Sequence, residues 1–394
     1  MSENHWSAAR KNNIAELSCE PSDLCSFASL QTNYYSDSYL RQWSSKWVPS
    51  YCWSAEGLIA DPIKTYLFAD AVILKDSYDL FYRLSDGTFQ CAPSYSSLAC
   101  QQYSRCTWNA FHNPGLSLLR LQQISDKAIE RIDGSLVFPL IWHRDHQNYW
   151  HFSFDIAFRL FYLQQVHSYL LNKIELAVVG QESLKPFQLQ LIEAILGYLP
   201  RVHYVSQAVQ CKHAIYIPPV QTLLPRHGWL VQYASHLKAA LGVNTTKMHT
   251  EDSDLSRRVT GSHSRLYIQR GNAKNPRQLY NEAEVTKLLA SNGFGCVDPG
   301  AYSLVQQAQL FSDACCVLGL HGSAFVNMIF MRPGAQVIEL TNSSYDPFHD
   351  FLLARQLGLY WQRLCTRSQN VRCISHAPFH ANISMIKRCL RIAL

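Results

Sequence analysis

One stretch of the sequence, residues 315–340, constrains the fold of this chain more than any other. It opens with an apolar run over residues 315–318, which predicts a short strand buried on both faces, as in a parallel sheet. Gly319 and Gly322 follow on either side of Leu320-His321 and allow the backbone to turn sharply. The sequence therefore predicts a strand that ends in a tight loop carrying a histidine.

The second half of this stretch predicts a helix followed by another strand. Ser323 is suited to cap a helix over residues 324–331, and Pro333-Gly334 ends that helix before the strand at 336–340. Such a strand–loop–helix unit presents backbone N–H groups at the carboxyl end of its strand, where doubly wound α/β proteins bind phosphate. The same turn is also common in α/β domains without a phosphate ligand, so both interpretations stay open here.

Composition places the chain among globular proteins with room for two domains. Its 394 residues are 47% hydrophobic and 16% charged, with a net charge of +6. The positive charge is mild and is not gathered in a basic arm. We therefore expect an anionic ligand or a membrane surface as a partner, and no nucleic acid.

The cysteine pattern and the lack of long apolar segments favour a cytoplasmic protein. The 13 cysteines contain no Cys-x-x-Cys pair, which is typical of reduced thiols rather than of a zinc or redox site. Residues 1–10 lack the apolar core of a signal peptide, and no apolar run approaches the length of about 18 residues that a membrane span needs. We expect a cytoplasmic protein, with peripheral association at the inner face of the membrane as a further option.

Alternating helix and strand patterns predict an α/β fold of two domains. Strands and helices before residue 217 predict an N-terminal domain over residues 1–225 on the acceptor side, followed by a Pro-rich hinge. The β–α alternation after the hinge predicts a parallel sheet in a second domain over residues 226–375. Residues 376–394 are expected to form a C-terminal helix that packs back on the N-terminal domain.

His151 and Asp155 form the first candidate pair. A helix starting near Trp150 would place both side chains on one face, because they are four residues apart. A histidine oriented by a carboxylate is suited to accept a proton as a general base. The alternative is a partly buried histidine near the helix start, with Asp155 bound to a nearby arginine.

Arg270 and Lys274 form the second candidate group. They follow the predicted strand at 266–269, in a turn that contains Gly271. Two cations at the carboxyl end of a strand are suited to neutralise a diphosphate leaving group. A solvated basic loop explains the same pattern equally well.

Metal-binding patterns are weak in this sequence. Asp252-Ser253-Asp254 matches the Asp-x-Asp pattern, but it follows the polar segment 247–251 rather than an apolar strand that would fix its position. The sequence also has no His-Glu-x-x-His cluster. We therefore assign no metal ligand.

Three blocks of the sequence carry a resemblance to a known family. The first is Asn148-Tyr149-Trp150-His151-Phe152 with Asp155. The second comprises Leu266-Tyr267-Ile268-Gln269-Arg270, Asn281-Glu282-Ala283-Glu284 and Gly293-Phe294. The third comprises Gly319-Leu320-His321-Gly322, Asn327, Pro333-Gly334 and Val337-Ile338-Glu339. Together they resemble glycosyltransferase family 61, although Gln269 stands where the family has Ser, and Ser323-Ala324-Phe325 where it has Ala-Gly-Leu.

The resemblance implies a GT-B-like fold, with two Rossmann-like domains facing a cleft, and a nucleotide sugar held mainly by the C-terminal domain. It also implies inversion, which requires a base for the acceptor hydroxyl and cations or dipoles for the departing diphosphate. The residues that it suggests for catalysis are His151, Asp155 and His321. Those that it suggests for donor binding are Arg270, Lys274, His321, Gly322, Ser323, Asn327 and Glu339, with Glu339 touching the ribose by analogy with other nucleotide sites.

The resemblance further implies an enzyme without a cofactor and without a metal. Its substrates would be a nucleotide-sugar donor, UDP-linked in our expectation, and a glycan or lipid-linked hydroxyl acceptor. A part in surface or capsular polysaccharide biosynthesis follows from the same resemblance. The alternative is a non-catalytic nucleotide- or sugar-binding protein of the same fold.

Overall fold

The computed structural model describes residues 14–19, 23–25, 58–60, 64–75, 80–92, 114–140, 147–179, 183–217, 228–243, 265–270, 277–342, 349–366 and 378–392. The chain divides into two compact units, residues 1–227 and 228–394. Most of the predicted hinge, Asp252-Ser253-Asp254 and Lys274 lie outside the described residues. The predicted domain limits stay a prediction.

The N-terminal unit is built on a sheet of eight strands, and a further two strands pair separately. The strands are β1 (Ile14–Cys19), β2 (Asp23–Cys25), β3 (Leu58–Ala60), β4 (Lys64–Leu74), β5 (Leu80–Arg83), β6 (Phe89–Cys91), β7 (Ile129–Leu140), β8 (Ile174–Val178), β9 (Val202–Tyr204) and β10 (Ala208–Tyr216). Their order in the large sheet is β6-β5-β4-β10-β7-β8-β9, with β1 on β4, while β2 pairs with β3.

This large sheet has a parallel half and an antiparallel half. Strands β10, β7, β8 and β9 are parallel to their neighbours in that half, whereas β1, β4, β5 and β6 pair antiparallel. A short turn at Asp86-Gly87, with φ +87° at Gly87, joins β5 to β6, and so short a connection can only link antiparallel strands. The predicted α/β class is confirmed, but only the parallel half follows Rossmann-like alternation.

The helical elements of this unit are α4 (Pro114–Gln123), η3 (Asp126–Ala128), α5 (Tyr149–His151), the π-helical η4 (Phe152–Ala157), α6 (Phe158–Val166), η5 (Ser168–Lys173) and α7 (Pro186–Leu196). Elements α5, η4 and α6 follow one another as one helical segment, the helix predicted from about Trp150. Asn148 caps its start, because the side-chain oxygen accepts the Trp150 N–H at 2.9 Å.

The C-terminal unit contains a fully parallel sheet of five strands, as predicted. Its strands are β11 (Arg265–Ile268), β12 (Gly295–Val297), β13 (Cys316–Leu320), β14 (Gln336–Asn342) and β15 (Tyr360–Thr366). Their order is β12-β11-β13-β14-β15, and every neighbouring pair is parallel. Strands β13 and β14 are buried along their whole length, which explains their almost continuous apolar sequence.

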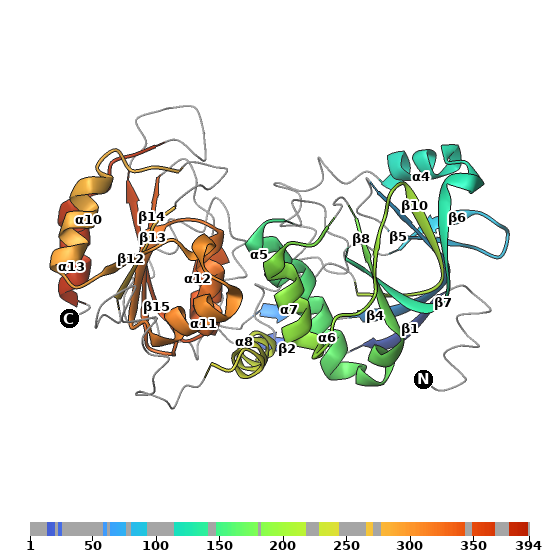
Figure 1. Cartoon of the computed structure of the whole chain (residues 1–394), viewed down its shortest axis with the longest axis horizontal. Helices are drawn as coiled ribbons and strands as arrows, with labels where there is room; N and C mark the ends of the chain where they lie inside the picture. The colour runs from blue at the N-terminus through green and yellow to red at the C-terminus, as the bar shows by residue number, and fades with distance from the viewer. Residues whose placement is uncertain are drawn as a thin grey trace. The chain divides into compact units, whose positions relative to one another are not determined.

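The helical elements of the C-terminal unit are α8 (Trp229–Ala240), α10 (Glu282–Ser291), η6 (Pro299–Ala301), α11 (Leu304–Asp313), the 3₁₀-helix η7 (Ser323–Phe330), α12 (His349–Gln356) and α13 (Ile383–Ile392). Figure 1 shows α10 and α13 on one face of the five-stranded sheet and α11 and α12 on the other. A capping box fixes the start of α11, because Ser303 and Gln306 each bond the other's backbone N–H.

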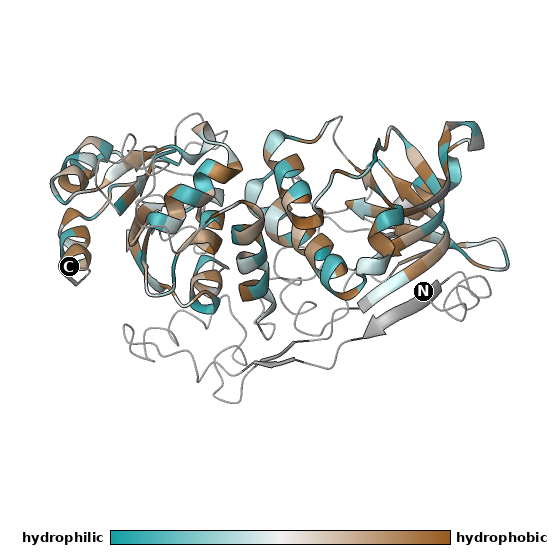
Figure 2. Cartoon of the chain, turned by 60° about the horizontal axis from the view of Figure 1, so that its bottom comes forward, coloured by the Kyte–Doolittle hydropathy of each residue, from teal (hydrophilic) through white to brown (hydrophobic). Residues whose placement is uncertain are grey.

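The C-terminal helix α13 packs within the C-terminal unit. Its apolar residues Ile386 and Leu390 belong to the hydrophobic core of the C-terminal unit, with Val285 and Leu289 of α10. Its hydrophilic and hydrophobic residues occupy different sides, which Figure 2 shows in teal and brown. The apolar side therefore packs on its own sheet, and a contact of α13 with the N-terminal unit stays a prediction. Among the described residues, no helix is long and apolar enough to cross a membrane.

Candidate active site

Two loops meet where the strand order of the C-terminal sheet reverses. In chain order the five strands lie as 2-1-3-4-5, so the chain leaves β11 toward β12 and later returns to β13 on the other side of β11. Open α/β sheets bind ligands outside the carboxyl ends of the strands at such a reversal. Here those ends lead into Arg270 after β11 and into His321-Gly322 after β13.

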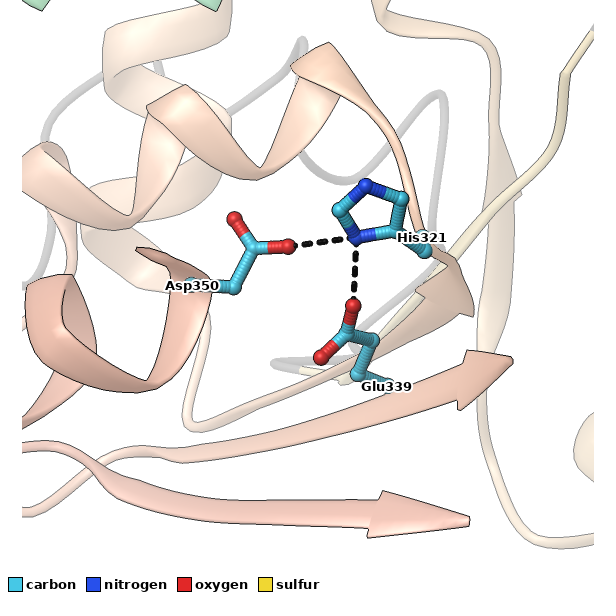
Figure 3. A group of neighbouring side chains, drawn as sticks. All are labelled: His321, Glu339 and Asp350. Atoms are coloured by element: carbon cyan, nitrogen blue, oxygen red, sulfur yellow. Dashed lines mark hydrogen bonds and ion pairs between the residues drawn. The ribbon is translucent and has the colours of Figure 1, made fainter. Parts of the chain in front are cut away.

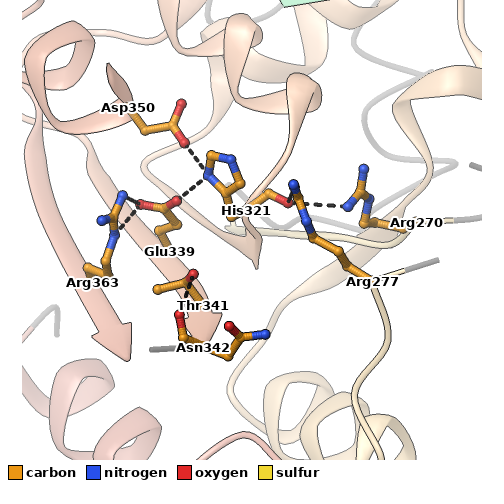
Figure 4. A network of polar contacts seen from close by, with 8 residues as sticks. All are labelled: Arg270, Arg277, His321, Glu339, Thr341, Asn342, Asp350 and Arg363. Carbon is orange, nitrogen blue, oxygen red and sulfur yellow. Dashed lines mark hydrogen bonds and ion pairs between the residues drawn. The ribbon is translucent and has the colours of Figure 1, made fainter. Parts of the chain in front are cut away.

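Two guanidinium groups converge on the backbone carbonyl of His321 (Figure 4). Arg277 donates from Nη1 at 2.7 Å, and Arg270 donates from Nη1 at 3.3 Å. Burial, and then the positive charge of Arg277, lower the pKa of Arg270 to about 10. Arg270 is still charged at neutral pH, so this edge of the sheet holds two neighbouring cations and is suited to an anion.

The glycines of the β13 loop keep these groups close together. A Cβ at Gly319 would lie 2.8 Å from the Cβ of Ile268 on β11, which is the strand partner of Gly319. A Cβ at Gly322 would lie 3.1 Å from Cζ and Nη2 of Arg270. Gly319 therefore permits the approach of two strands, whereas Gly322 makes room for the Arg270 guanidinium.

The His321 side chain turns into the protein and faces two carboxylates (Figure 3). Its Nδ1 lies 2.5 Å from Oε1 of Glu339, as a hydrogen bond, and 2.7 Å from Oδ2 of Asp350, as an ion pair. The other ring nitrogen, Nε2, is directed away from both acids in this view. All three side chains are buried, so their charges interact with little solvent screening.

A fourth charge, that of Arg363, completes this cluster. Burial raises the pKa of Glu339, but Arg363 and His321 outweigh burial and bring the value down to about 2. Burial and the charge of Glu339 raise the pKa of Asp350 to about 6. Burial lowers the pKa of His321, but Asp350 and Glu339 outweigh it and raise the value above normal. At neutral pH the cluster therefore pairs two carboxylates with two cations.

His321, Glu339 and Asp350 also have the composition of a metal-binding group. One ligand atom from each residue lies within 4.8 Å of the others. Two observations favour a proton over a metal ion at this point. The contacts at Nδ1 have hydrogen-bond lengths, and Arg363 already neutralises the Glu339 carboxylate.

In the N-terminal unit, His151 and Asp155 contact each other as predicted. Nδ1 of His151 lies 2.8 Å from Oδ2 of Asp155, and the contact spans the start of the π-helical turn. Burial raises the pKa of Asp155, although His151 and Arg159 act in the opposite direction. Arg159 is fully buried and donates from Nε to the Asp155 carbonyl at 2.7 Å. Single π-helical turns within α-helices, such as η4, are frequent at functional sites.

Comparison with known families places these groups in one context. Residues 149–338 match the family model described as Glycosyltransferase 61. This match assigns residues 149–338 to glycosyltransferase family 61. The matched range contains His151, Asp155, Arg270 and His321, but it ends one residue before Glu339. A search of curated proteins found no match for this glycosyltransferase.

Three of the predicted donor residues take different places in this glycosyltransferase. Ser323 begins helix η7 but does not cap it, because Gly322 occupies the cap position. Asn327 is fully buried and donates to Gln307 Oε1 at 2.9 Å, so it holds η7 to α11. Glu339 is also fully buried, with one oxygen bonded to His321 and the other to Arg363, and its contact with a ribose stays a prediction. Lys274 lies outside the described residues.

Sequence reasoning missed Arg277, Asp350 and Arg363. Arg277 follows the Gly271 turn, beyond Arg270 and Lys274, the two cations that the sequence pattern indicates. Asp350 lies in the first turn of α12, but nothing in the local sequence distinguishes a buried acid there from a solvated one. Arg363 gave the clearest signal, since it is a charged residue within the strand Tyr360–Thr366. A buried charge needs a partner, and that partner proves to be Glu339.

Proposed function

We propose that this glycosyltransferase binds a nucleoside-diphosphate sugar at the carboxyl edge of its C-terminal sheet. The sugar is then transferred to a hydroxyl acceptor, with inversion at the anomeric carbon. The observation that carries the proposal is the convergence of Arg270 and Arg277 on the His321 carbonyl at the strand-order reversal. Two guanidinium groups at that point are suited to bind a diphosphate, whose oxygens match their planar forks.

The proposed reaction is a single displacement. The acceptor oxygen attacks the anomeric carbon as the bond from that carbon to the diphosphate oxygen breaks. The bonding electrons leave with the nucleoside diphosphate, and the hydroxyl proton passes to a base. Negative charge therefore grows on the diphosphate, where fixed cations stabilise it more in the transition state than in the ground state.

His151 is the candidate base, with Asp155 as the group that orients it. The Asp155 carboxylate at Nδ1 fixes the ring tautomer that leaves Nε2 to accept a proton. The same carboxylate stabilises the imidazolium that forms after proton transfer. The proposal thus gives different tasks to the two histidines: His151 accepts a proton, and His321 serves the leaving group.

The finer features of this activity are predictions from the family resemblance. We propose a UDP-linked donor, a glycan or lipid-linked acceptor, and a part in surface polysaccharide biosynthesis at the cytoplasmic side of a membrane. We also propose a GT-B-like arrangement and catalysis without a metal cofactor, with Arg270 and Arg277 supplying the charge that a metal would otherwise supply.

A panel of UDP- and GDP-sugars with released nucleotide as the readout tests transfer, and titration calorimetry with UDP and GDP tests binding. Arg270→Ala should weaken binding by about 1.5–3 kcal/mol, the loss of a charge-assisted hydrogen bond. Arg332→Ala is the matched control, since Arg332 is exposed at the opposite edge of the same sheet, just before β14.

Two results would overturn the proposal. If Arg270→Ala binds UDP and GDP as tightly as the wild type, the diphosphate site lies elsewhere. Binding of nucleotide sugars without any transfer, across the panel and a range of sugar acceptors, would favour the non-catalytic alternative.

A further inference from the structure

Asp350 brings a second carboxylate to a histidine that already has one. The first carboxylate, Glu339, comes from strand β14, and Asp350 comes from the first turn of helix α12. Both contact the same ring nitrogen of His321, at 2.5 and 2.7 Å. A neutral ring that used Nδ1 as an acceptor would place its lone pair against two carboxylates, so Nδ1 must carry a proton.

The charges around His321 decide between the neutral ring and the cation. Glu339 is neutralised by Arg363. Apart from His321, no described residue donates a hydrogen bond to either oxygen of Asp350, so the contact with His321 is the one that offsets its buried charge. A buried carboxylate without a positive partner is costly. An imidazolium at His321 removes that cost, whereas a neutral ring does not.

We propose that Asp350 is a positioning residue that keeps His321 an imidazolium, so that Nε2–H is a fixed cationic donor for the diphosphate of the nucleotide sugar. This inference rests on the proposed donor site. His321 is then not the base of the reaction, because its Nε2 already holds a proton. When the sugar–oxygen bond breaks, the proton stays on His321 and its hydrogen bond to the diphosphate oxygen strengthens.

The groups that face His321 act in opposite directions. Glu339 of β14 and Asp350 of α12 favour the cation, while Arg363 of β15 weakens the effect of Glu339. Arg270 and Arg277 donate to the His321 carbonyl, and their charges disfavour a third cation nearby. Because Arg363 already neutralises Glu339, that carboxylate by itself offsets little of this repulsion. Asp350 supplies the second negative charge, and the raised pKa of His321 agrees with this balance.

The test compares UDP affinity between pH 6 and pH 8.5 in the wild type and in Asp350→Asn. The variant keeps the shape of Asp350 and removes its charge. UDP titrates equally in both experiments, so the ratio of the two affinities reports on the protein. We expect the UDP affinity of the variant to fall about tenfold relative to that of the wild type as pH rises. The reason is that a charge-assisted hydrogen bond is lost when the His321 ring deprotonates.

The matched control is Glu175→Gln, which breaks another histidine–carboxylate contact. Glu175 Oε2 lies 2.5 Å from His203 Nε2 in the N-terminal sheet. A merely structural effect of losing such a contact should lower the melting temperature without changing the pH dependence of UDP affinity. Both variants are therefore scored for melting temperature and for affinity on the same preparation.

Nitrogen-15 NMR of the wild-type histidines keeps the inference testable if Asp350→Asn fails to fold. His321, identified by the signal that His321→Gln loses, should show two protonated ring nitrogens at pH 8. A neutral ring at pH 8 would overturn the inference. An affinity ratio that stays constant with pH in a folded Asp350→Asn would also overturn it. A third contrary result would be that a divalent metal restores the activity of chelator-treated enzyme and that Asp350→Asn cannot bind this metal. Wild-type protein that binds no nucleotide would refute the donor site alone, because the NMR result is independent of it.

Discussion

Arg363 holds one oxygen of the Glu339 carboxylate with two guanidinium nitrogens, Nε and Nη2, each 2.8 Å from Oε2. Both side chains are buried, and the two residues are register partners on the neighbouring parallel strands β14 and β15. The other oxygen of Glu339 contacts His321. The Glu339 carboxylate therefore connects the guanidinium group of Arg363 on β15 to His321, in the loop at the candidate donor site.

Glu339→Gln should lower the free energy of unfolding at pH 7 by about 3–5 kcal/mol, because buried Arg363 loses the carboxylate that neutralises it. The sign of the pH dependence follows from the pKa. Burial raises the pKa of Glu339, but Arg363 and His321 bring it to about 2, below the ordinary value of 4.5. The stabilisation is complete above 4.5 and is lost as pH falls toward 2.

Urea unfolding at several pH values checks this prediction. The difference between wild type and Glu339→Gln should shrink from pH 5 to pH 2. Adding Arg363→Met to Glu339→Gln should recover part of the loss at pH 7, since both buried charges are then gone. A constant difference across this pH range would contradict the placement of an ionised Glu339 in the core.

Gly319→Ala and Gly322→Ala should separate stability from donor binding. The new Cβ at position 319 would meet Ile268 at 2.8 Å, so the strands must move apart, with a loss of about 1–3 kcal/mol of stability. At position 322 the Cβ would meet the end of the Arg270 side chain at 3.1 Å. That side chain can shift, so UDP affinity should fall more than melting temperature. Equal effects of the two variants on both measurements would argue against this division.

Arg277→Ala should weaken UDP binding by about 1.5–3 kcal/mol, because Arg277 makes the shorter contact with the His321 carbonyl beside Arg270. The neighbouring positive charges also repel each other in the free protein. The Arg270→Ala and Arg277→Ala effects should therefore not be additive, and a double-mutant cycle by calorimetry measures the coupling. Arg332→Ala again serves as the control, and the idea fails if Arg277→Ala matches that control.

His151→Ala should reduce the transfer rate by at least about 10²-fold while UDP affinity stays unchanged, since a general base acts on the acceptor. Asp155→Asn should lose less, because it disturbs the orientation of His151 without removing the proton acceptor. Rates and affinities are measured on the same preparation. His203→Ala is the control for the loss of a buried histidine in the same unit. If His151→Ala lost UDP affinity in proportion to its transfer rate, His151 would belong to the donor site instead.

Local sequence was sufficient for the elements and for part of the site. The apolar runs of β13 and β14, the Gly319-to-Gly322 turn and the i,i+4 spacing of His151 and Asp155 are short-range features. Each is fixed by backbone sterics or helical periodicity, so each could be predicted and was found. The family pattern was visible for the same reason, because its blocks are contiguous stretches of chain.

Only the tertiary structure decided how the charges of the C-terminal unit are paired. The cluster joins His321 from a loop, Glu339 and Arg363 from adjacent strands, and Asp350 from a helix. Parallel pairing of β14 and β15 sets Glu339 beside Arg363, and nothing in the order of residues encodes that register. The burial of Asn327 and Glu339 was likewise not visible in the sequence, because burial depends on what packs over a residue. Sequence determines which groups carry charge, and packing determines which charges must be paired and which can reach a ligand.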